Sequence, residues 1–239
     1  MEPIIEAVAI KKNYGQQNVL RGIDLTILPG DFLCIMGRSG CGKTTLLKII
    51  GLMHPPTSGE VAFESRWTQS LFPDELSDIR RRKIGFVFQE FNLMESISVK
   101  ENILLPAILD KQDITKAEER MAPFFQLLRI EQLLDKLPQE LSVGEKQRAA
   151  ICRALINEPQ IILADEPTGN LDSNAGAEVI TIFKRINQEL GITIVMITHD
   201  SKVAQAAKEV LFLKDGKIYD RLVNGVGSET QISEKMLEV

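Results

Sequence analysis

The residues with the clearest chemistry in this 239-residue chain lie between positions 37 and 45. They match the spacing G-x-x-x-x-G-K-[ST] of a phosphate-binding loop and read Gly37, Arg38, Ser39, Gly40, Cys41, Gly42, Lys43, Thr44 and Thr45. Glycines let the backbone N–H groups of such a loop approach oxygen anions, and the following helix directs its positive dipole end at them. Lys43 would reach the phosphates, and the Thr44 hydroxyl would ligate Mg²⁺. The loop therefore predicts a polyphosphate ligand.

Two acids and a histidine follow predicted buried strands. The apolar segment 160–164 ends in Asp165 and Glu166, and the apolar segment 192–198 ends at His199. Buried unpaired carboxylates are costly, so we expect Asp165 to face Mg²⁺ and Glu166 to face a water. If the two strands are parallel neighbours, His199 lies at the same sheet edge as the phosphates. An exposed pair of acids and a structural histidine are the alternatives.

The flanking segments have the pattern that these residues need. Residues 32–36 form an apolar run of strand length before the loop, and residues 46–50 have helical apolar spacing after it. Segments 4–14 and 19–28 predict a β-hairpin, with Tyr14 at its turn. That tyrosine could pack at the strand end or stack on a purine ring.

The rest of the chain predicts a helical insertion and a C-terminal strand pair. A strand over 84–88 ends at Gln89, and Ser142 or Gly144 is available to cap a helix. Residues 65–79 match no pattern, the run 80–83 predicts a solvated helix end, and the chain from 223 onward is expected to be loosely held. The expected helices and strands span residues 60–64, 101–109, 116–137, 145–157, 172–190, 192–198, 201–208, 210–213 and 217–220.

Composition and charge bound the class of protein. The length suits one large domain, and the net charge of -5 argues against a general nucleic-acid binder. Cys34, Cys41 and Cys152 show neither metal-ligand nor disulfide spacing, which fits a reducing cytosol. Neither a membrane span nor a signal peptide is evident. We expect a soluble protein that can dock on a membrane protein.

The order of these motifs resembles the nucleotide-binding subunit of ABC transporters, from Ile4 to about Asp220. The most specific part is 141–148, Leu-Ser-Val-Gly-Glu-Lys-Gln-Arg, which looks like the ABC signature loop and precedes the strand at 161–165. The sequences of segments 163–172 and 88–93 resemble those of a narrower branch of the family. This branch contains the ATPases of lipoprotein-release, macrolide-efflux, cell-division and antimicrobial-peptide-resistance systems.

The resemblance implies an α/β fold of the P-loop NTPase type. It would have a mixed sheet core, an N-terminal antiparallel β subdomain and an inserted α-helical subdomain. As a single domain over 1–239, the chain would divide into a core with the β subdomain, a helical subdomain with the signature loop, and a C-terminal tail. These parts would span residues 1–90 and 158–222, residues 91–157, and residues 223–239.

The resemblance also implies ATP and Mg²⁺ as cofactors and assigns the site. Glu166 would be the catalytic carboxylate, His199 the γ-phosphate switch and Gln89 the residue that senses Mg²⁺ and the attacking water. Mg²⁺ would be bound by Thr44, Gln89 and Asp165. Besides the phosphate loop, the nucleotide would contact Tyr14 (stacked on adenine), Val19, Ser142, Gly144, Glu145 and Asp172.

The family works as a head-to-tail dimer, in which Ser142 and Gly144 of one subunit would close on ATP held by the phosphate loop of the other. The first signature glycine of the family is Val143 here. A β-branched residue narrows the backbone choices and adds bulk, so we expect weaker ATP-driven closure than with glycine.

The implied function is an ATPase at the cytoplasmic face of the cell membrane. It would pair with a second copy of itself and drive a transmembrane permease in export or extraction, with no nucleic-acid partner. A soluble ABC protein acting on ribosomes or nucleic acid is the alternative, but such proteins usually carry a second cassette or a long coiled coil. A small-molecule kinase would have no use for a signature loop. The sequence does not indicate the transported substrate.

Overall fold

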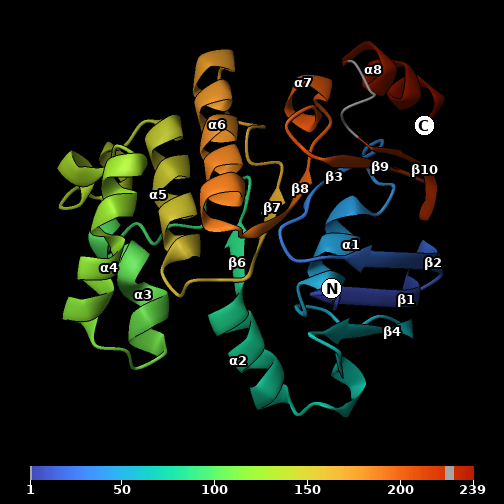
Figure 1. The fold of residues 1–239 in the computed structure, drawn as a ribbon, viewed down its shortest axis with the longest axis horizontal. Helices are drawn as coiled ribbons and strands as arrows, with labels where there is room; N and C mark the ends of the chain where they lie inside the picture. Colours follow the sequence, from blue (N-terminus) through green and yellow to red (C-terminus); the bar gives the residue numbers. More distant parts are fainter. Residues whose placement is uncertain (1, 224–228) are drawn as a thin grey trace.

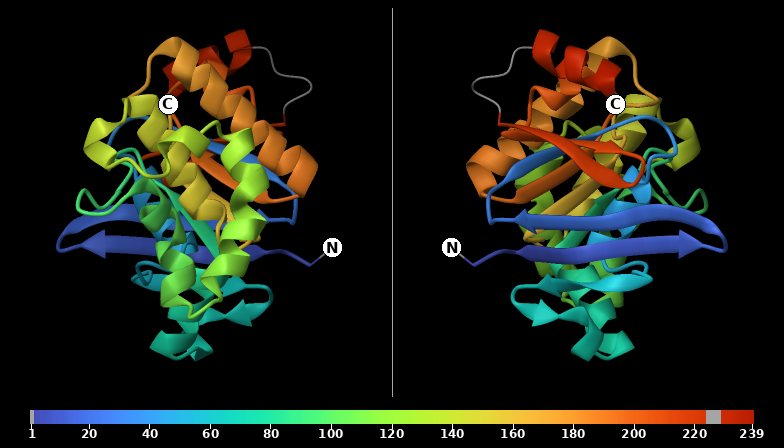
Figure 2. Two further views of the ribbon diagram at one scale, coloured as in Figure 1. Left: turned by 90° about the vertical axis from the view of Figure 1, so that its left-hand side faces the viewer. Right: turned by 90° about the vertical axis from the view of Figure 1, so that its right-hand side faces the viewer.

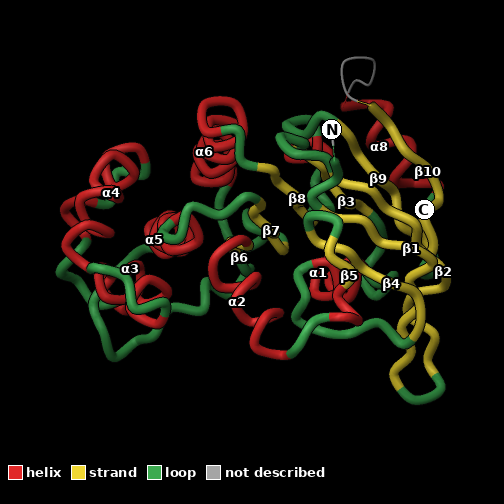
Figure 3. Tube along the Cα trace, turned by 60° about the horizontal axis from the view of Figure 1, so that its bottom comes forward, coloured by secondary structure: helices red, strands yellow, loops and turns green. Residues whose placement is uncertain are grey.

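A computed structural model describes residues 2–223 and 229–239 of the chain. Its centre is a six-stranded sheet, with a smaller antiparallel sheet on one side and the helices α3, α4 and α5 on the other (Figures 1 and 3). The mixed sheet core, the N-terminal antiparallel part and the inserted helices expected from the sequence are therefore all present. Their exact boundaries as subdomains remain a prediction.

The six-stranded sheet positions the chemistry. Its order is β10-β9-β3-β8-β7-β6, parallel except for β10. The strands are β3 (Phe32–Met36), β6 (Ile84–Val87), β7 (Ile161–Asp165), β8 (Thr193–Ile197), β9 (Glu209–Lys214) and β10 (Lys217–Val223). Ile197 pairs with both Ile35 and Asp165, so the strands end at one edge. In open α/β sheets, ligands bind at this carboxyl edge.

The antiparallel sheet has the order β2-β1-β4-β5. Its strands are β1 (Ile5–Tyr14), β2 (Gln17–Ile27), β4 (Ser58–Phe63) and β5 (Arg66–Trp67). Figure 2 shows the predicted hairpin, β1 and β2, running across the molecule. Helix α1 (Lys43–Ile50) packs Leu46 and Ile49 in one cluster with Ile23 of this sheet and Leu211 of the other. Both sheets therefore hold the helix that follows the phosphate loop.

The inserted helices begin and end within two residues of the predicted positions, except at the C-terminal end of the second helix. The insertion consists of α3 (Val99–Leu109), α4 (Ile114–Leu127), α5 (Val143–Leu155) and the short 3₁₀ turns η2 (Glu131–Leu133) and η3 (Pro138–Glu140). The helix predicted over 116–137 ends at Leu127. Arg129 takes a left-handed φ of 52°, and the chain turns so that Ile130 and Leu133 are buried. Tertiary burial overrides the helical pattern here.

The segment without a sequence pattern contains β5, the turn η1 (Thr68–Ser70) and α2 (Pro73–Lys83). Pro73 stands at the first helical position, and Glu75 accepts a hydrogen bond from the Phe72 N–H. The cationic run 80–83 does end this helix, as predicted. The expectation that this run is solvated is wrong, because each of its three arginines donates a hydrogen bond to a residue outside α2.

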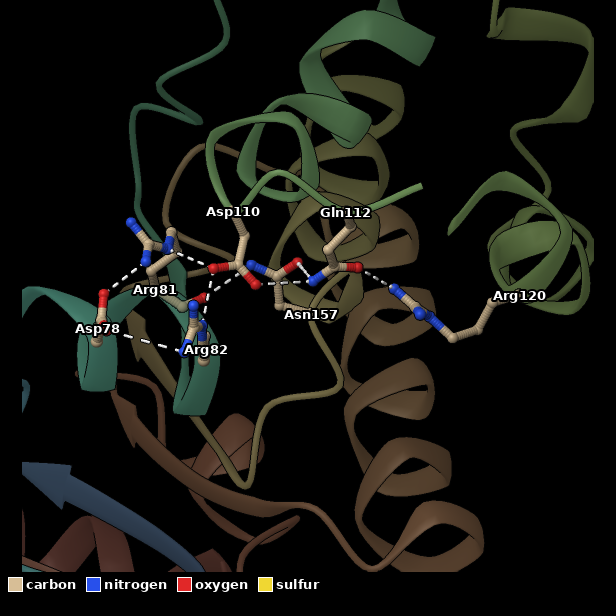
Figure 4. A network of polar contacts seen from close by, with 7 residues as sticks. All are labelled: Asp78, Arg81, Arg82, Asp110, Gln112, Arg120 and Asn157. Atoms are coloured by element: carbon tan, nitrogen blue, oxygen red, sulfur yellow. Dashed lines mark hydrogen bonds and ion pairs between the residues drawn. The ribbon is translucent and has the colours of Figure 1, made fainter. Parts of the chain in front are cut away.

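A polar network around Asp110 joins α2 to the inserted helices (Figure 4). The Asp110 side chain is 8% exposed and accepts hydrogen bonds from Nε of Arg81 at 2.8 Å and Nε of Arg82 at 2.7 Å. Asn157, beyond α5, donates to the Arg81 carbonyl at 2.8 Å, and Gln112 donates to both Asp110 and Asn157. Burial alone would raise the pKa of Asp110, but the hydrogen bonds from Arg82 and Gln112 and the arginine charge hold it below its usual value.

Of the C-terminal helices, the first packs against α5 and β8, and the last packs against β9. These helices are α6 (Ser173–Leu190), α7 (Ser201–Ala204) and α8 (Glu229–Glu238). The expectation of a loosely held tail is wrong for residues 229–239, because Ile232 is fully buried, Ser233 bonds Ser201 and Lys235 pairs with Asp220 at 2.7 Å. The tail residues 224–228 lie outside the described residues. Within the described ranges, no helix has the length and apolarity to cross a membrane.

Candidate functional site

The phosphate loop runs from the end of β3 into α1 and is held from inside by its own lysine. Lys43, 7% exposed, donates hydrogen bonds from Nζ to the carbonyls of Gly37 at 2.7 Å and Arg38 at 2.9 Å. Gly42 caps α1 at φ 108°, and a Cβ on Gly37 would lie 2.3 Å from the Leu213 carbonyl oxygen. Only glycine fits these two positions without displacing the backbone.

The loop fits a polyphosphate because it offers backbone N–H donors and borders an open cavity. Its tip residue Gly40 has no other atom within 4 Å of an added Cβ, and a cavity of about 600 Å³ lies over the tip. Val19, Arg38 and Lys214 are among its lining residues. The first N–H groups of α1 have no partner within the helix and, together with the helix dipole, favour an anion there.

Thr44 and Asp165 bring two oxygen ligands together beside the loop. The Thr44 Oγ1 atom donates a hydrogen bond to Asp165 Oδ1 at 3.2 Å. Burial raises the pKa of Asp165 and the charge of Glu166 adds to that rise, while Thr44 and nearby lysines oppose it. A hydroxyl and a carboxylate are hard oxygen donors, so the pair fits Mg²⁺, which keeps its other positions for phosphate and water.

Glu166 and His199 meet at the same edge. His199 Nδ1 lies 3.4 Å from Glu166 Oε2, with the two side chains 64% and 25% exposed. The Glu166 N–H donates to the Ile197 carbonyl at 3.0 Å, and its backbone has a left-handed φ of 46°. A non-glycine residue in this region needs support from its surroundings and often lies at a functional site. The parallel pairing of β7 with β8 thus brings together the acid and the histidine, as the sequence predicted.

Gln89 lies in the turn after β6, where the parallel pairing of β6 with β7 places it beside the turn that begins at Glu166. Its side chain bonds Asn170, a residue to which sequence reasoning assigned no role. No local sequence signal marks this contact, because the two residues lie 81 positions apart in the chain. Shortly after Gln89, the carbonyls of Phe91 and Asn92 accept hydrogen bonds from Arg153 of α5.

The signature residues lie at the start of α5, which Figure 1 shows apart from α1. Ser142 caps α5, and its N–H and hydroxyl both donate to the Glu145 carboxylate at 2.8 Å. These hydrogen bonds lower the pKa of Glu145. Val143 is 44% exposed and Gly144 is the second residue of the helix. Within one chain, these residues lie away from the phosphate loop. That separation is what a composite site between two chains requires.

The two remaining predicted contacts have different surroundings. Asp172 caps α6 by accepting hydrogen bonds from the N–H groups of Asn174 and Ala175. Tyr14 is 48% exposed, its hydroxyl lies 3.5 Å from Nδ1 of His54, and the Lys12 ammonium lies 5.3 Å from its ring centre. The tyrosine is not among the residues that line the cavity over the loop. Its stacking on adenine stays a prediction.

Comparison with known proteins gives concordant matches. The family model described as "ABC transporter" matches residues 20–169. The bacitracin export ATP-binding protein BceA of Halalkalibacterium halodurans is 43% identical, with 93% of this chain and 89% of that protein covered. The macrolide export ATP-binding/permease protein MacB of Syntrophobacter fumaroxidans is also 43% identical, covering 97% of this chain, but the chain spans only 33% of that protein.

Solved structures agree. The dimeric structure of MJ0796, described as a bacterial ABC transporter cassette, superposes with a TM-score of 0.84 at 41% identity over 92% of this chain and 98% of that one. A post-hydrolysis dimer of the same cassette, bound to ADP and Pi, has a TM-score of 0.83 at 38% identity, with the same coverage. A protein named MJ0796 from Methanocaldococcus jannaschii is 45% identical over 83% of this chain and 86% of its own length. None of these comparisons supports the alternative of a protein acting on ribosomes or nucleic acid.

Proposed function

The chain belongs to the ABC transporter family, and from that premise we propose that it is the subunit whose ATP hydrolysis drives a membrane permease. The observation that carries the proposal is the convergence at one sheet edge of the Lys43 loop, the Thr44–Asp165 pair and the Glu166–His199 pair. This convergence supports the proposal, because hydrolysis needs an acid, an anion site and a metal site close to one γ-phosphate and one attacking water.

Each residue has a defined part in the reaction. The N–H groups at the start of α1 and the Lys43 ammonium bind the β- and γ-phosphates, while Thr44 and Asp165 hold Mg²⁺. Mg²⁺, when bound, neutralises phosphate charge. Glu166 orients a water for in-line attack and accepts its proton, and His199 holds the γ-phosphate as ADP leaves. The rate gain comes from positioning and from fixed charges and dipoles.

Two copies complete each site. In a head-to-tail dimer, the first N–H groups of α5, with Ser142 and Gly144, close on ATP held by the partner's phosphate loop. The physical basis is the same as at α1, because free N–H groups and the positive end of a helix dipole favour an anion. The dimeric assemblies of the similar MJ0796 cassette support this arrangement.

The permease is proposed to dock beside Gln89. A cavity of about 300 Å³ lies between α2, β6 and the inserted helices, and its lining includes Arg81, Phe88, Pro106 and Arg153. Phe88 directly precedes Gln89, so a segment docked there would contact the chain next to the ATP site. Docking from the cytoplasmic side would make the subunit peripheral to the membrane. The names of BceA and MacB favour export.

The test is to purify the Glu166→Gln variant from its native membranes in MgATP and to identify the proteins that remain bound by mass spectrometry. We expect a membrane protein with few spans and a large extracytoplasmic domain. A Lys43→Ala variant, which cannot hold ATP, serves as the control for retention that does not depend on the closed dimer. Recovery of ribosomes or nucleic-acid proteins without any permease would overturn the proposal.

A further inference from the structure

Gln89 and Asn170 form a reciprocal amide pair between the turn after β6 and the turn after β7. Asn170 donates from Nδ2 to the main-chain oxygen of Gln89 at 2.9 Å, and Gln89 donates from Nε2 to Asn170 Oδ1 at 3.4 Å. The Gln89 amide also lies close to the Gly169 backbone, where an added Cβ would be 3.0 Å from Nε2. The pair therefore holds the Gln89 side chain against the loop that begins at Glu166.

This pair determines which end of the Gln89 amide is free. A main-chain carbonyl only accepts hydrogen bonds, so Asn170 has to present its NH₂ group to the Gln89 backbone. Its own Oδ1 then faces the Gln89 side chain and requires a donor there, which is Nε2. Among the hydrogen bonds of the described residues, none is accepted by Gln89 Oε1. The free end is therefore the oxygen, which is the end that can bind a cation.

We propose that Asn170 is a positioning residue for ATP hydrolysis, which orients the Gln89 amide so that its oxygen points toward Mg²⁺. The inference rests on the proposed function, because it takes Gln89 as a residue that faces the metal. Asn170 acts only through Gln89 and does not itself touch the reacting atoms. The χ3 torsion of Gln, about the Cγ–Cδ bond, is broad and nearly two-fold, so without Asn170 the side chain would also populate the orientation that presents NH₂ to the cation.

Loss of Asn170 should therefore weaken the binding of Mg²⁺. Removing it frees the rotamers of a long side chain and the choice between two amide orientations. We expect the free Mg²⁺ concentration that gives half-maximal ATP binding to rise about three- to ten-fold. ATP affinity in the presence of EDTA should not change, because the phosphate loop is untouched.

The experiment measures binding of radiolabelled ATP at equilibrium across a Mg²⁺ titration, in full-length protein carrying Glu166→Gln so that no ATP is consumed. Four proteins are compared in that background: the parent, Asn170→Ala, Gln89→Ala and the double variant. Asn174→Ala, another exposed asparagine four positions along the chain, is the matched control and should leave the titration unchanged. Thermal unfolding of each variant shows that it is folded.

The double variant separates positioning from other effects. If Asn170 acts through Gln89, Asn170→Ala adds no further shift once Gln89 is alanine. A shift from Gln89→Ala but none from Asn170→Ala overturns the inference and leaves the proposed function intact, as does an Asn170→Ala shift that persists in the double variant. Absence of any shift from Gln89→Ala would instead remove the metal-facing role of Gln89, and the inference with it.

Discussion

The imidazole of His199 contacts the carboxylate of Glu166, with 3.4 Å between Nδ1 and Oε2. The contact joins the ends of β7 and β8, and it places a proton acceptor beside a group that can donate to phosphate. The two side chains are supported differently, because Glu166 is mostly buried and has its N–H bound to Ile197, whereas the His199 side chain is largely exposed. We therefore expect substitution at Glu166 to affect ATP turnover much more than ATP binding.

Glu166→Gln keeps the size of the side chain and removes its basicity. We expect ATP binding to be retained and turnover to fall at least ~100-fold, the lower limit for loss of a positioned general base. Phosphate release and nucleotide binding are measured on the same preparation. The exposed Glu131→Gln, on the inserted helices, is the control. Near-normal turnover in Glu166→Gln would remove the residue from its proposed role.

Val143→Gly should strengthen dimer closure. The side chain is 44% exposed at the first residue of α5, so its removal costs little packing, while the backbone that approaches the partner's phosphates gains freedom. In a Glu166→Gln background with ATP, we expect a dissociation constant of the dimer that is several-fold lower, about 1 kcal/mol in free energy. Light scattering at several protein concentrations measures it. If neither dimerisation nor ATPase rate changes, Val143 does not limit closure.

Asp110→Asn should destabilise the protein in a pH-dependent manner. The folded protein holds the pKa of Asp110 below its usual value, so the ionised carboxylate contributes stability above pH ~4 and loses it as the pH falls through the lowered pKa. We expect a loss of about 1–2 kcal/mol at neutral pH that diminishes below pH ~4. Denaturant unfolding at several pH values measures it, with Asp74→Asn on α2 as control. A loss of equal size at every pH would mean that charge is not the cause.

Gln147→Met should stabilise the protein. Gln147 is fully buried on α5, and neither polar atom of its amide has a hydrogen-bond partner among the described residues. An apolar side chain of similar shape avoids that desolvation cost, so we expect a gain of about 1 kcal/mol in unfolding free energy. The exposed Gln126→Met on α4 should change it by less than ~0.5 kcal/mol. Destabilisation by Gln147→Met would indicate that a bound water satisfies the amide.

The parts of the fold that the sequence predicts are those set by local pattern. The phosphate loop, the apolar strands and the acids and histidine that follow them are all visible in short windows, and parallel pairing explains why they meet. The site's further contacts depend on residues far apart in the chain. The Gln89–Asn170 pair spans 81 positions and the Arg82–Asp110 bond spans 28, so no local window contains either.

Helix ends, like these contacts, depend on packing that a short stretch of sequence does not show. The helical periodicity of 116–137 is real, but burial of Ile130 and Leu133 requires a turn at Arg129 that the pattern does not contain. Helix α8 was missed because its sequence is polar apart from a few residues, one of which, Ile232, is fully buried against the core. Its stability comes from tertiary packing, which periodicity in a short segment does not report.

The position of β3 has a consequence for how the chain is made. All five residues of this strand are buried, yet its sheet neighbours β8 and β9 begin only at Thr193 and Glu209. During synthesis, this apolar strand therefore cannot pair with its native neighbours until most of the polypeptide has left the ribosome. Such delayed long-range pairing is slow and exposes aggregation-prone surface. Truncation before β9 should yield a chaperone-dependent fragment rather than a smaller ATP-binding protein.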